Sequence, residues 1–372
     1  MPAYDAFLLV SFGGPQGPDD VLPFLENVTR GRRIPPERLA QVAEHYHAFG
    51  GVSPINQQCR DLLAAVAKDF ADEGLNLPLY WGNRNWQPFV ADTVRAMAAD
   101  GVRRAIAFVT SAYGSYSSCR QYLDDIERAR AEVGAHAPVI DKIRHYFNHP
   151  GFVEPLAGST LAALGRLPAG VQGGAHLVFT AHSIPETMAA ASGPHEGGPH
   201  EAGRARTPES GRYVTQLTET ARLVSERVAA QVGERPWRLV YQSRSGPPSQ
   251  PWLGPDVRDH LEELASAGAP AAVLVPAGFV SDHMEVRHDL DLEAKDTAAR
   301  LGLPLERAAT PGADPRFVSM ITELVRERLA GAGPARERPA RDSPSAASPA
   351  ALGRLGPACD TCPPGCCVPV SR

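Results

Sequence analysis

The chain has 372 residues, 43% hydrophobic and 21% charged, which is a globular composition with room for two ordinary domains or one large α/β unit. Its formal net charge of −5 gives no electrostatic reason to expect a nucleic-acid partner. The short apolar run near the start lacks a basic region and a cleavage site, and no run approaches the length that crosses a bilayer. We therefore expect a cytoplasmic protein without a transmembrane segment.

In the first half, short apolar runs alternate with helical patterns. The runs that predict buried strands are 6–12, 77–82 and 104–110. Helices are predicted at 19–28, 37–48, from about 54 to 72, at 87–99 and in a stretch that ends at 130. Strands that alternate with helices in this way indicate a parallel sheet covered on both faces.

The second half repeats this order. Strands are predicted at 175–183, 237–243 and 271–275, and helices at 152–164, 214–228, 256–267 and 317–329. The segment 189–210 is rich in Gly, Pro and charge and predicts a mobile surface insertion. The predicted organisation is one domain over 1–150, a second over 151–330, a flexible linker over 331–357 and a cysteine-rich tail over 358–372.

An acidic and imidazole cluster follows the strand 271–275. Its members, seven side chains in twelve residues, are Asp282, His283, Glu285, His288, Asp289, Asp291 and Glu293. On an α-helix, Glu285, Asp289 and Glu293 would share one face, where they repel each other unless a cation is bound. A solvated acidic face is the alternative. Its place at the carboxyl end of a strand favours a ligand site.

His182 ends the strand 175–183 and has the same strand-end position as the cluster. A neutral imidazole accepts a proton near neutral pH or binds a metal, and Glu285 can do either. Such a pair without cysteine suits a loosely held divalent cation rather than a closed zinc site. A structural histidine is the alternative.

The strand-end loops of the first half are rich in aromatic and basic side chains. They carry Phe12, Trp86, Tyr113, Tyr116 and Tyr122, with Arg30, Arg32, Arg33, Arg84 and Ser53 nearby. Aromatic walls with a few guanidinium groups suit a flat apolar ligand that has carboxylates on its edge. The alternative is that the aromatic residues are core and the arginines are solvated.

Five segments together resemble the ferrochelatase family over about residues 4–330. They are LLVSFGGP (8–15), YHAFGGVSPIN (46–56), TAHSIP (180–185), QSRSGPPSQPWLGPD (242–256) and GFVSDHMEVRHDLD (278–291). GNRNW (82–86), YSSCRQY (116–122) and the terminal cysteines make the chain most similar to the actinobacterial coproporphyrin III ferrochelatases. The resemblance implies two Rossmann-like domains, each a parallel sheet flanked by helices, with a porphyrin in the cleft between them.

The resemblance also implies roles for single residues. His182 would take pyrrole protons and contact the incoming iron, with Glu285 as its partner across the macrocycle. Asp289 and Glu293 would form a metal path or second cation site. The porphyrin-contacting positions would be Ser53, Tyr122, Arg30 and Phe12. At Phe12 the Firmicutes branch has a tyrosine that ligates iron in the product, so that ligand must be absent here or supplied elsewhere.

The activity implied is insertion of Fe²⁺ into coproporphyrin III to give coproheme in haem biosynthesis. Protoporphyrin IX as substrate, a non-catalytic tetrapyrrole carrier, an iron–sulfur sensor and a cobalt or nickel chelatase are the alternatives. We expect a monomer that contacts other enzymes of the haem pathway.

Four of the six cysteines crowd into the tail as Cys359-x2-Cys362-x3-Cys366-Cys367. In a reducing cytosol this spacing indicates a metal site before a disulfide. The resemblance implies a [2Fe–2S] cluster held by Cys359, Cys362 and Cys367, with Cys119 as the fourth ligand or Cys366 as the alternative. A small zinc site is the competing interpretation.

Overall fold

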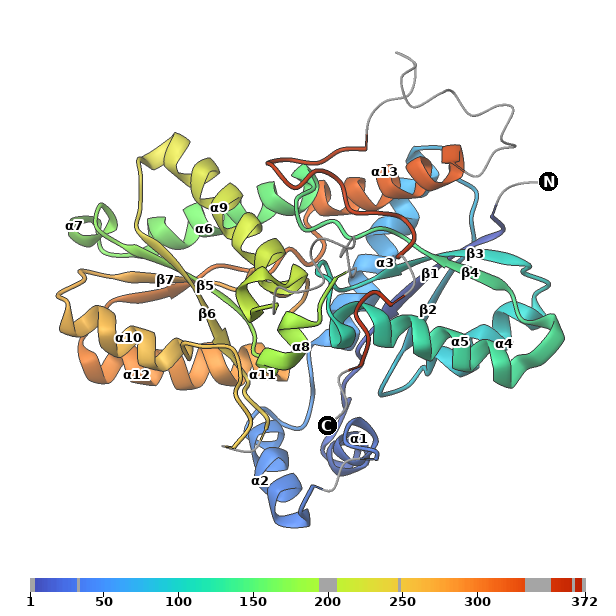
Figure 1. Ribbon diagram of the computed structural model, residues 1–372, viewed down its shortest axis with the longest axis horizontal. Helices are drawn as coiled ribbons and strands as arrows, with labels where there is room; N and C mark the ends of the chain where they lie inside the picture. Colours follow the sequence, from blue (N-terminus) through green and yellow to red (C-terminus); the bar gives the residue numbers. More distant parts are fainter. Residues whose placement is uncertain are drawn as a thin grey trace.

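Two four-stranded parallel sheets form the centre of the molecule (Figure 1). The computed structural model describes residues 4–31, 34–193, 206–246, 249–331, 349–362 and 365–369. The strand orders are β2-β1-β3-β4 and β6-β5-β7-β8, so each central strand has parallel neighbours on both sides. The predicted α/β fold with two parallel sheets is confirmed.

The strands of the first sheet are β1 (Ala6–Ser11), β2 (Leu79–Asn83), β3 (Arg104–Val109) and β4 (Val139–Lys142). Those of the second are β5 (His176–His182), β6 (Trp237–Gln242), β7 (Ala272–Val275) and β8 (Leu305–Arg307). The sequence predicted β1, β2, β3, β5, β6 and β7 and missed β4 and β8, which each lie at one edge of a sheet. These edge strands are short and half-exposed, so they lack the continuous apolar run that marks a buried parallel strand.

The helices of the first half are α1 (Val21–Val28), α2 (Pro36–His47), α3 (Ile55–Asp72), α4 (Val90–Ala99) and α5 (Gln121–Val133). Alternate residues of β1 explain how they pack. Leu8 and Val10 face α4 and α5, whereas Phe7 and Leu9 face the core that includes α3.

The helices of the second half are α6 (Pro150–Arg166), α7 (Ala169–Gln172), α8 (Glu186–Ala190), α9 (Arg212–Val232), α10 (Val257–Ser266), α11 (Met284–Val286), α12 (Lys295–Leu301) and α13 (Pro315–Gly331). α6 and α9 cover one face of the second sheet, and α10 and α12 cover the other (Figure 1). No helix in the described residues is both long and apolar enough to cross a membrane.

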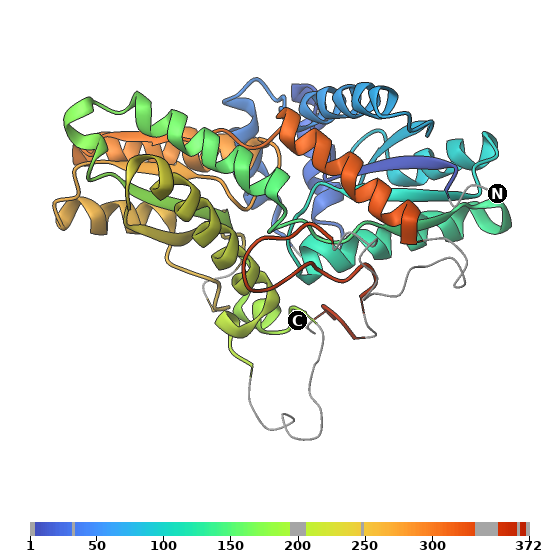
Figure 2. The ribbon, with the colours of Figure 1, turned by 90° about the horizontal axis from the view of Figure 1, so that it is seen from above.

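The last helix, α13, returns to the first half. It packs on α3 as well as α6 and lies over the first sheet in Figure 2. Arg326 on α13 donates to the Glu73 carbonyl at 2.8 Å, and Arg144 pairs with Glu327 at 2.8 Å. The two halves therefore share one core, and the domain boundary at residue 150 stays a prediction.

Two helical segments have the wider π-turn. They are η2 (Tyr116–Arg120), which leads into α5, and η5 (Arg287–Ala294), which joins α11 to α12. Insertions of this kind are frequent at functional sites. One contains Cys119 and the other contains Asp289 and Glu293, so both carry residues singled out in the sequence.

The described residues from 349 onward lie against both halves (Figures 1 and 2). Of the predicted linker 331–357, residues 332–348 lie outside the described residues. Its remaining end is not a free connection. Asn148 donates to the carbonyls of Leu352 and Gly356 at 3.0 and 2.8 Å, and the Arg354 amide donates to Glu219 at 2.9 Å.

The predicted surface insertion 189–210 is described only at its two ends, since 194–205 lie outside the described residues. At one end Ser192 is fully buried. At the other end Pro208–Ser210 form a 3₁₀ turn that leads into α9. The first end therefore packs into the fold, whereas Thr207, Glu209 and Ser210 at the second end are exposed, and the mobility of the segment stays a prediction.

Candidate active site

His182 and Glu285 meet where two strands of the second sheet end. His182 is the last residue of β5, and Glu285 follows β7 on the short helix α11. His182 Nε2 lies 3.6 Å from Glu285 Oε1, and His182 Nδ1 faces the Ser183 carbonyl. Because β5 and β7 are neighbours, the fold brings both strand ends to one edge of the sheet and these two side chains within reach of each other.

The charges of this pair depend on each other. Burial alone would lower the pKa of His182, but the Glu285 carboxylate, with the Ser183 carbonyl and Asp289, raises it to about 9. Burial would likewise raise the pKa of Glu285, and the His182 imidazolium holds it well below its usual range. In the absence of a cation the two side chains therefore form an ion pair at neutral pH.

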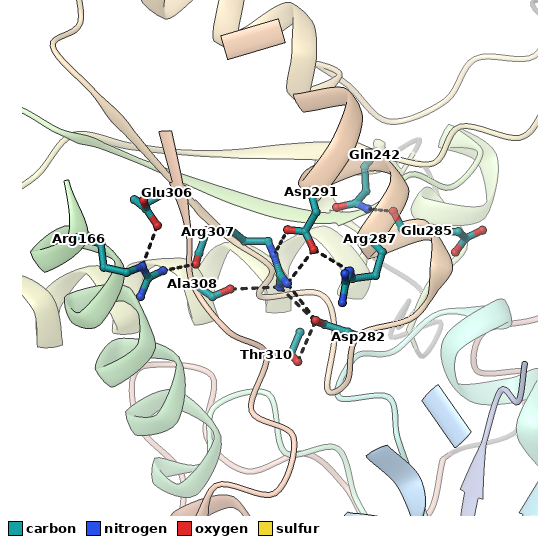
Figure 3. Close-up of polar contacts among 10 residues, drawn as sticks. All are labelled: Arg166, Gln242, Asp282, Glu285, Arg287, Asp291, Glu306, Arg307, Ala308 and Thr310. Carbon is teal, nitrogen blue, oxygen red and sulfur yellow. Dashed lines mark hydrogen bonds and ion pairs between the residues drawn. The ribbon is translucent and has the colours of Figure 1, made fainter. Parts of the chain in front are cut away.

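Arg307, on β8, binds two carboxylates of the acidic cluster and so separates them from the members that remain available to a cation (Figure 3). Arg307 donates to Asp282 at 2.9 and 3.1 Å and to Asp291 at 2.6 and 3.1 Å. Arg287 adds a second pair with Asp291 at 3.0 Å. Figure 3 shows both of these carboxylates turned toward Arg307 and the Glu285 side chain turned away from it. Asp282 and Asp291 are therefore committed to ion pairs, whereas Glu285 lies beside His182.

A second group with the chemistry of a cation site lies one helical turn further on. His288, Asp289 and Glu293 offer one ligand atom each, all within 4.8 Å of one another. In the described part of the chain these residues form the one group of three or more histidine, cysteine or acidic side chains that meets this criterion. An imidazole with two carboxylates suits a borderline divalent cation.

The neighbours of this group hold it in place. Ser243 donates to Asp289, and Gln242 Nε2 lies 3.4 Å from the same carboxylate and 3.3 Å from the Glu285 carbonyl. Arg258 approaches Glu293 at 3.3 Å. The trio is therefore tied both to β6 and to the helix segment that carries Glu285.

Sequence reasoning named His288 in the cluster but did not place it with Glu293, because it assumed an α-helix. Residues five apart lie on different faces of an α-helix, but the π-turn of η5 bonds residue i to i+5 and brings His288 next to Glu293. It also missed His45 on α2, whose ring stacks on His288 with centroids 3.8 Å apart. No sequence signal predicted that stack, since it joins the two halves of the chain.

The porphyrin-contacting candidates of the first half differ in exposure. Phe12 is 37% exposed and packs edge-on against Phe24, and Arg30 is exposed at the end of α1. Ser53 is buried against Gly14, where a Cβ would come 2.8 Å from its Oγ. Phe12 directly follows β1, the Ser53 amide donates to the Pro15 carbonyl at 2.9 Å, and Arg30 lies two residues beyond α1, which projects with α2 from one side of the molecule (Figure 1).

Tyr122 does not line an open surface. It is buried in the core beneath α4 and α5, and the Arg84 guanidinium lies 4.6 Å from its ring centre. Arg84 is fixed there by Asp125 at 2.5 Å and also lies 5.8 Å from the Phe12 ring. In the described arrangement Arg84, rather than Tyr122, lies between the core and the exposed Phe12.

The fold brings Cys119 to the terminal cysteines. Cys119 in η2 is buried and hydrogen-bonds to Cys362, which also contacts Cys359 and Cys366. Cys366 and Cys367 are both buried, with sulfurs 3.7 Å apart. The Gly193 amide donates to Cys367 Sγ at 3.1 Å. Cys362 therefore lies among thiols from two distant parts of the chain, and Cys366 connects it to Cys367.

Comparison with known proteins identifies the family. A family model described as ferrochelatase matches residues 4–329. The chain belongs to the ferrochelatase family. It is 55% identical over 369 residues to the coproporphyrin III ferrochelatase of Streptomyces griseus subsp. griseus, covering 98% of this chain and 93% of that protein. It is 51% identical over 372 residues to the protein of the same name from Nocardia farcinica, covering 100% and 98% of the two chains.

Among solved structures, SirB from Bacillus subtilis with Fe³⁺ has the same fold as this ferrochelatase-family chain. The TM-score is 0.50 at 10% sequence identity, and the match covers 88% of this chain and 96% of that one. At this identity the likeness concerns the fold alone. The family motifs can therefore be located in the fold. TAHSIP forms the carboxyl end of β5 and the turn that follows it, and SDHMEV leads from β7 into α11.

Proposed function

We propose that this member of the ferrochelatase family inserts Fe²⁺ into a porphyrin. The observation that carries the proposal is the His182–Glu285 pair, 3.6 Å apart at two neighbouring strand ends, next to a three-ligand group. A porphyrin must lose two pyrrole protons to accept a metal, so the site needs a base and a place for the cation. An imidazole and a set of oxygen ligands provide both.

In this proposal His182 is the proton acceptor and Glu285 holds the incoming cation opposite it. A divalent cation on Glu285 opposes the imidazolium charge and favours the neutral imidazole that can take a proton. A cleft that holds the macrocycle bent would expose its nitrogen lone pairs, at a strain of roughly 1–5 kcal/mol drawn from binding elsewhere on the ring. Phe12, Ser53, Arg30 and Tyr122 are the proposed ring contacts, although Tyr122 would have to act through Arg84.

Asp289 and Glu293 are proposed as the route by which iron reaches Glu285. His288 completes their ligand set, and the Asp289 charge already acts on His182. Oxygen and imidazole ligands bind divalent iron without the tight hold of thiolates, which suits a metal that must move on.

We propose coproporphyrin III as the porphyrin, with protoporphyrin IX as the alternative. The proposal is supported by the names of the relatives from Streptomyces griseus and Nocardia farcinica, at 55% and 51% identity. The decisive experiment compares iron insertion into both porphyrins by the purified protein. A kcat/KM at least tenfold higher for coproporphyrin III supports the assignment, and equal or reversed values refute it.

The role of His182 is tested by His182→Ala, which should abolish insertion while porphyrin binding, followed by absorption or fluorescence, persists. Full activity of this variant would refute the proposed site. His176→Ala is the matched control, because His176 lies at the opposite end of the same strand.

We further propose that the cysteine site holds a [2Fe–2S] cluster, which would supply a redox-active or structural centre. The proposed ligands are Cys119, Cys359, Cys362 and Cys367, with Cys366 as the alternative to one of them. The donor set suits such a cluster, since Cys362 lies near Cys119, Cys359 and Cys366, and Cys119 and Cys367 are buried. Visible absorption with iron and sulfide near 2 each per chain supports it. Colourless protein that contains zinc refutes it.

Three further expectations stay proposals at this stage: a cytoplasmic location, a monomeric state and contact with other enzymes of haem synthesis. Cell fractionation and sedimentation of the purified protein test the first two. Co-purification from cells tests the third.

A further inference from the structure

The first turn of α9 lies between the cysteine site and the strand end that carries His182. Arg212, the first residue of this helix, approaches Cys359 Sγ to 4.0 Å. Its neighbour Tyr213 points to the other side and donates from its hydroxyl to the His182 carbonyl at 2.9 Å. Adjacent residues of one helix therefore touch the two proposed centres of the molecule.

Arg212 occupies space that two glycines leave for it. A Cβ on Gly114, in the loop after β3, would come 2.8 Å from Arg212 Cδ. A Cβ on Gly193, which has a φ of +99°, would come 3.0 Å from Arg212 Cβ. Both halves of the chain thus contribute a residue without a side chain at this position, and the guanidinium is directed to the cysteines by its surroundings.

The charge of Arg212 suits that position. Its guanidinium lies 4.0 Å from Cys359 Sγ, close enough to attract the negative charge of an occupied thiolate site. Thiolates are the metal-binding form of cysteine, so a nearby cation favours the ligands and stabilises the net negative charge of a thiolate-bound cluster.

A second connection runs beside the first. Gly193 donates to Cys367 Sγ at 3.1 Å and accepts from the Cys367 amide at 3.3 Å. The preceding residue, Ser192, is fully buried and accepts from the Tyr213 amide at 2.9 Å through its hydroxyl. The Ser192 carbonyl accepts from the Arg212 amide at 3.1 Å. The turn that holds Cys367 is therefore also the turn that holds the start of α9.

We propose that Arg212 and Tyr213 couple the cysteine site to the active site. Arg212 binds electrostatically to the occupied thiolate site, and Tyr213 is a positioning residue that holds the backbone of His182. When the site is empty, the tail and the turn at Gly193 lose their anchor, the first turn of α9 loosens, and His182 is held less well. The inference rests on the proposed roles of His182 and of the cluster.

The test uses full-length protein with its cluster, and the same protein after anaerobic removal of the cluster by a chelator that is then removed by gel filtration. Four variants are compared with the wild type. Tyr213→Phe removes the hydroxyl and keeps the ring, and its matched control is Tyr80→Phe, whose hydroxyl bonds to Asp100 away from the site. Arg212→Gln is matched by Arg227→Gln on the same helix, which loses only a pair with Glu154.

Arg212→Gln should shift the reduction potential of the cluster to more negative values and shorten the lifetime of its visible absorption, since a cation that favours the more negative reduced form is gone. Arg227→Gln should leave both unchanged. Tyr213→Phe should keep the wild-type spectrum and potential. Its kcat for iron insertion should fall about three- to tenfold with the porphyrin KM unchanged, as expected for one hydrogen bond.

The decisive measurement is the effect of cluster removal on kcat. It should lower kcat several-fold in the wild type and in Tyr80→Phe, but cause little further loss in Tyr213→Phe, because the connection is already broken. Equal fold losses in all three proteins overturn the coupling. A wild type that inserts no iron into either porphyrin refutes the proposed function instead. An active but colourless wild type overturns the cluster and the coupling together.

Discussion

Replacement of Arg307 by methionine is the sharpest test of how the acidic cluster is divided. Arg307 makes four contacts between 2.6 and 3.1 Å with Asp282 and Asp291, and all three side chains are less than a quarter exposed. Arg307→Met would leave the partly buried Asp282 without its cation, and Asp291 with Arg287 as its remaining partner. Loss of one partner of a buried ion pair costs about 3–5 kcal/mol, so we expect the free energy of unfolding to fall by about 2–4 kcal/mol at this partly solvated site.

The assay is urea unfolding, with Arg166→Met as the matched control. Arg166 pairs with Glu306 at 2.8 Å but is 51% exposed, so its loss should cost less than 1 kcal/mol. Both pairs are drawn in Figure 3. Adding Asp282→Asn and Asp291→Asn to Arg307→Met should recover most of the stability, since no partly buried carboxylate is left unpaired and Arg287, which loses Asp291, is 43% exposed.

The separation of the carboxylates by Arg307 also predicts how two aspartate variants differ in their KM for iron. Asp291→Asn should leave the KM for iron within about twofold of the wild type, whereas Asp289→Asn should raise it about tenfold, since one carboxylate is bound to Arg307 and the other lies in the ligand group. Equal unfolding penalties for the two arginine variants, or equal KM values for the two aspartate variants, would show that the division by Arg307 is wrong.

Three further changes have defined outcomes. Glu293→Gln should raise the KM for iron about tenfold with kcat little changed, measured by initial rates of insertion. Burial, followed by the charge of Arg144, lowers the pKa of His149 to about 4, so wild-type stability should fall by up to about 3 kcal/mol as the pH drops from 6.5 toward 4. His149→Asn, whose oxygen can replace Nδ1 as acceptor from the Gly151 amide, should flatten that part of the stability profile. Gly211→Ala should lower the free energy of unfolding by about 1–3 kcal/mol, because its Cβ would come 1.9 Å from the Ala189 carbonyl oxygen.

The direction of the pH effect follows from proton binding. The unfolded chain binds a proton on His149 below pH 6.5 and the folded protein does so only near pH 4, so acid favours the unfolded state between these values. A wild-type profile that His149→Asn does not change would contradict this explanation. For Glu293→Gln, Glu262→Gln on the neighbouring helix α10 is a suitable control, and for Gly211→Ala the control is Gly165→Ala on α6, where an added Cβ would meet open space.

The sequence by itself determined the two sheets and the positions of His182 and Glu285 at or beyond the ends of their strands. Continuous apolar runs such as 6–12 and 271–275 are long enough to predict buried parallel strands, and in a parallel sheet their ends must meet at one edge. That local information placed His182 and Glu285 at one edge of a sheet before any contact was known. The sequence did not predict the edge strands β4 and β8, because these short, half-exposed strands contain no continuous apolar run.

Only the tertiary structure decided which members of the acidic cluster are available to a cation. The answer depends on Arg307, which lies beyond the cluster in the chain and comes to it through the pairing of β7 with β8. It also depends on the π-turn of η5, a backbone choice that side-chain spacing does not reveal and that brings His288 to Glu293. The meeting of Cys119 with the tail and of Tyr213 with His182 likewise joins residues far apart in sequence. Such contacts follow from packing of the whole core, whereas hydrophobic periodicity reports only on neighbours along the chain.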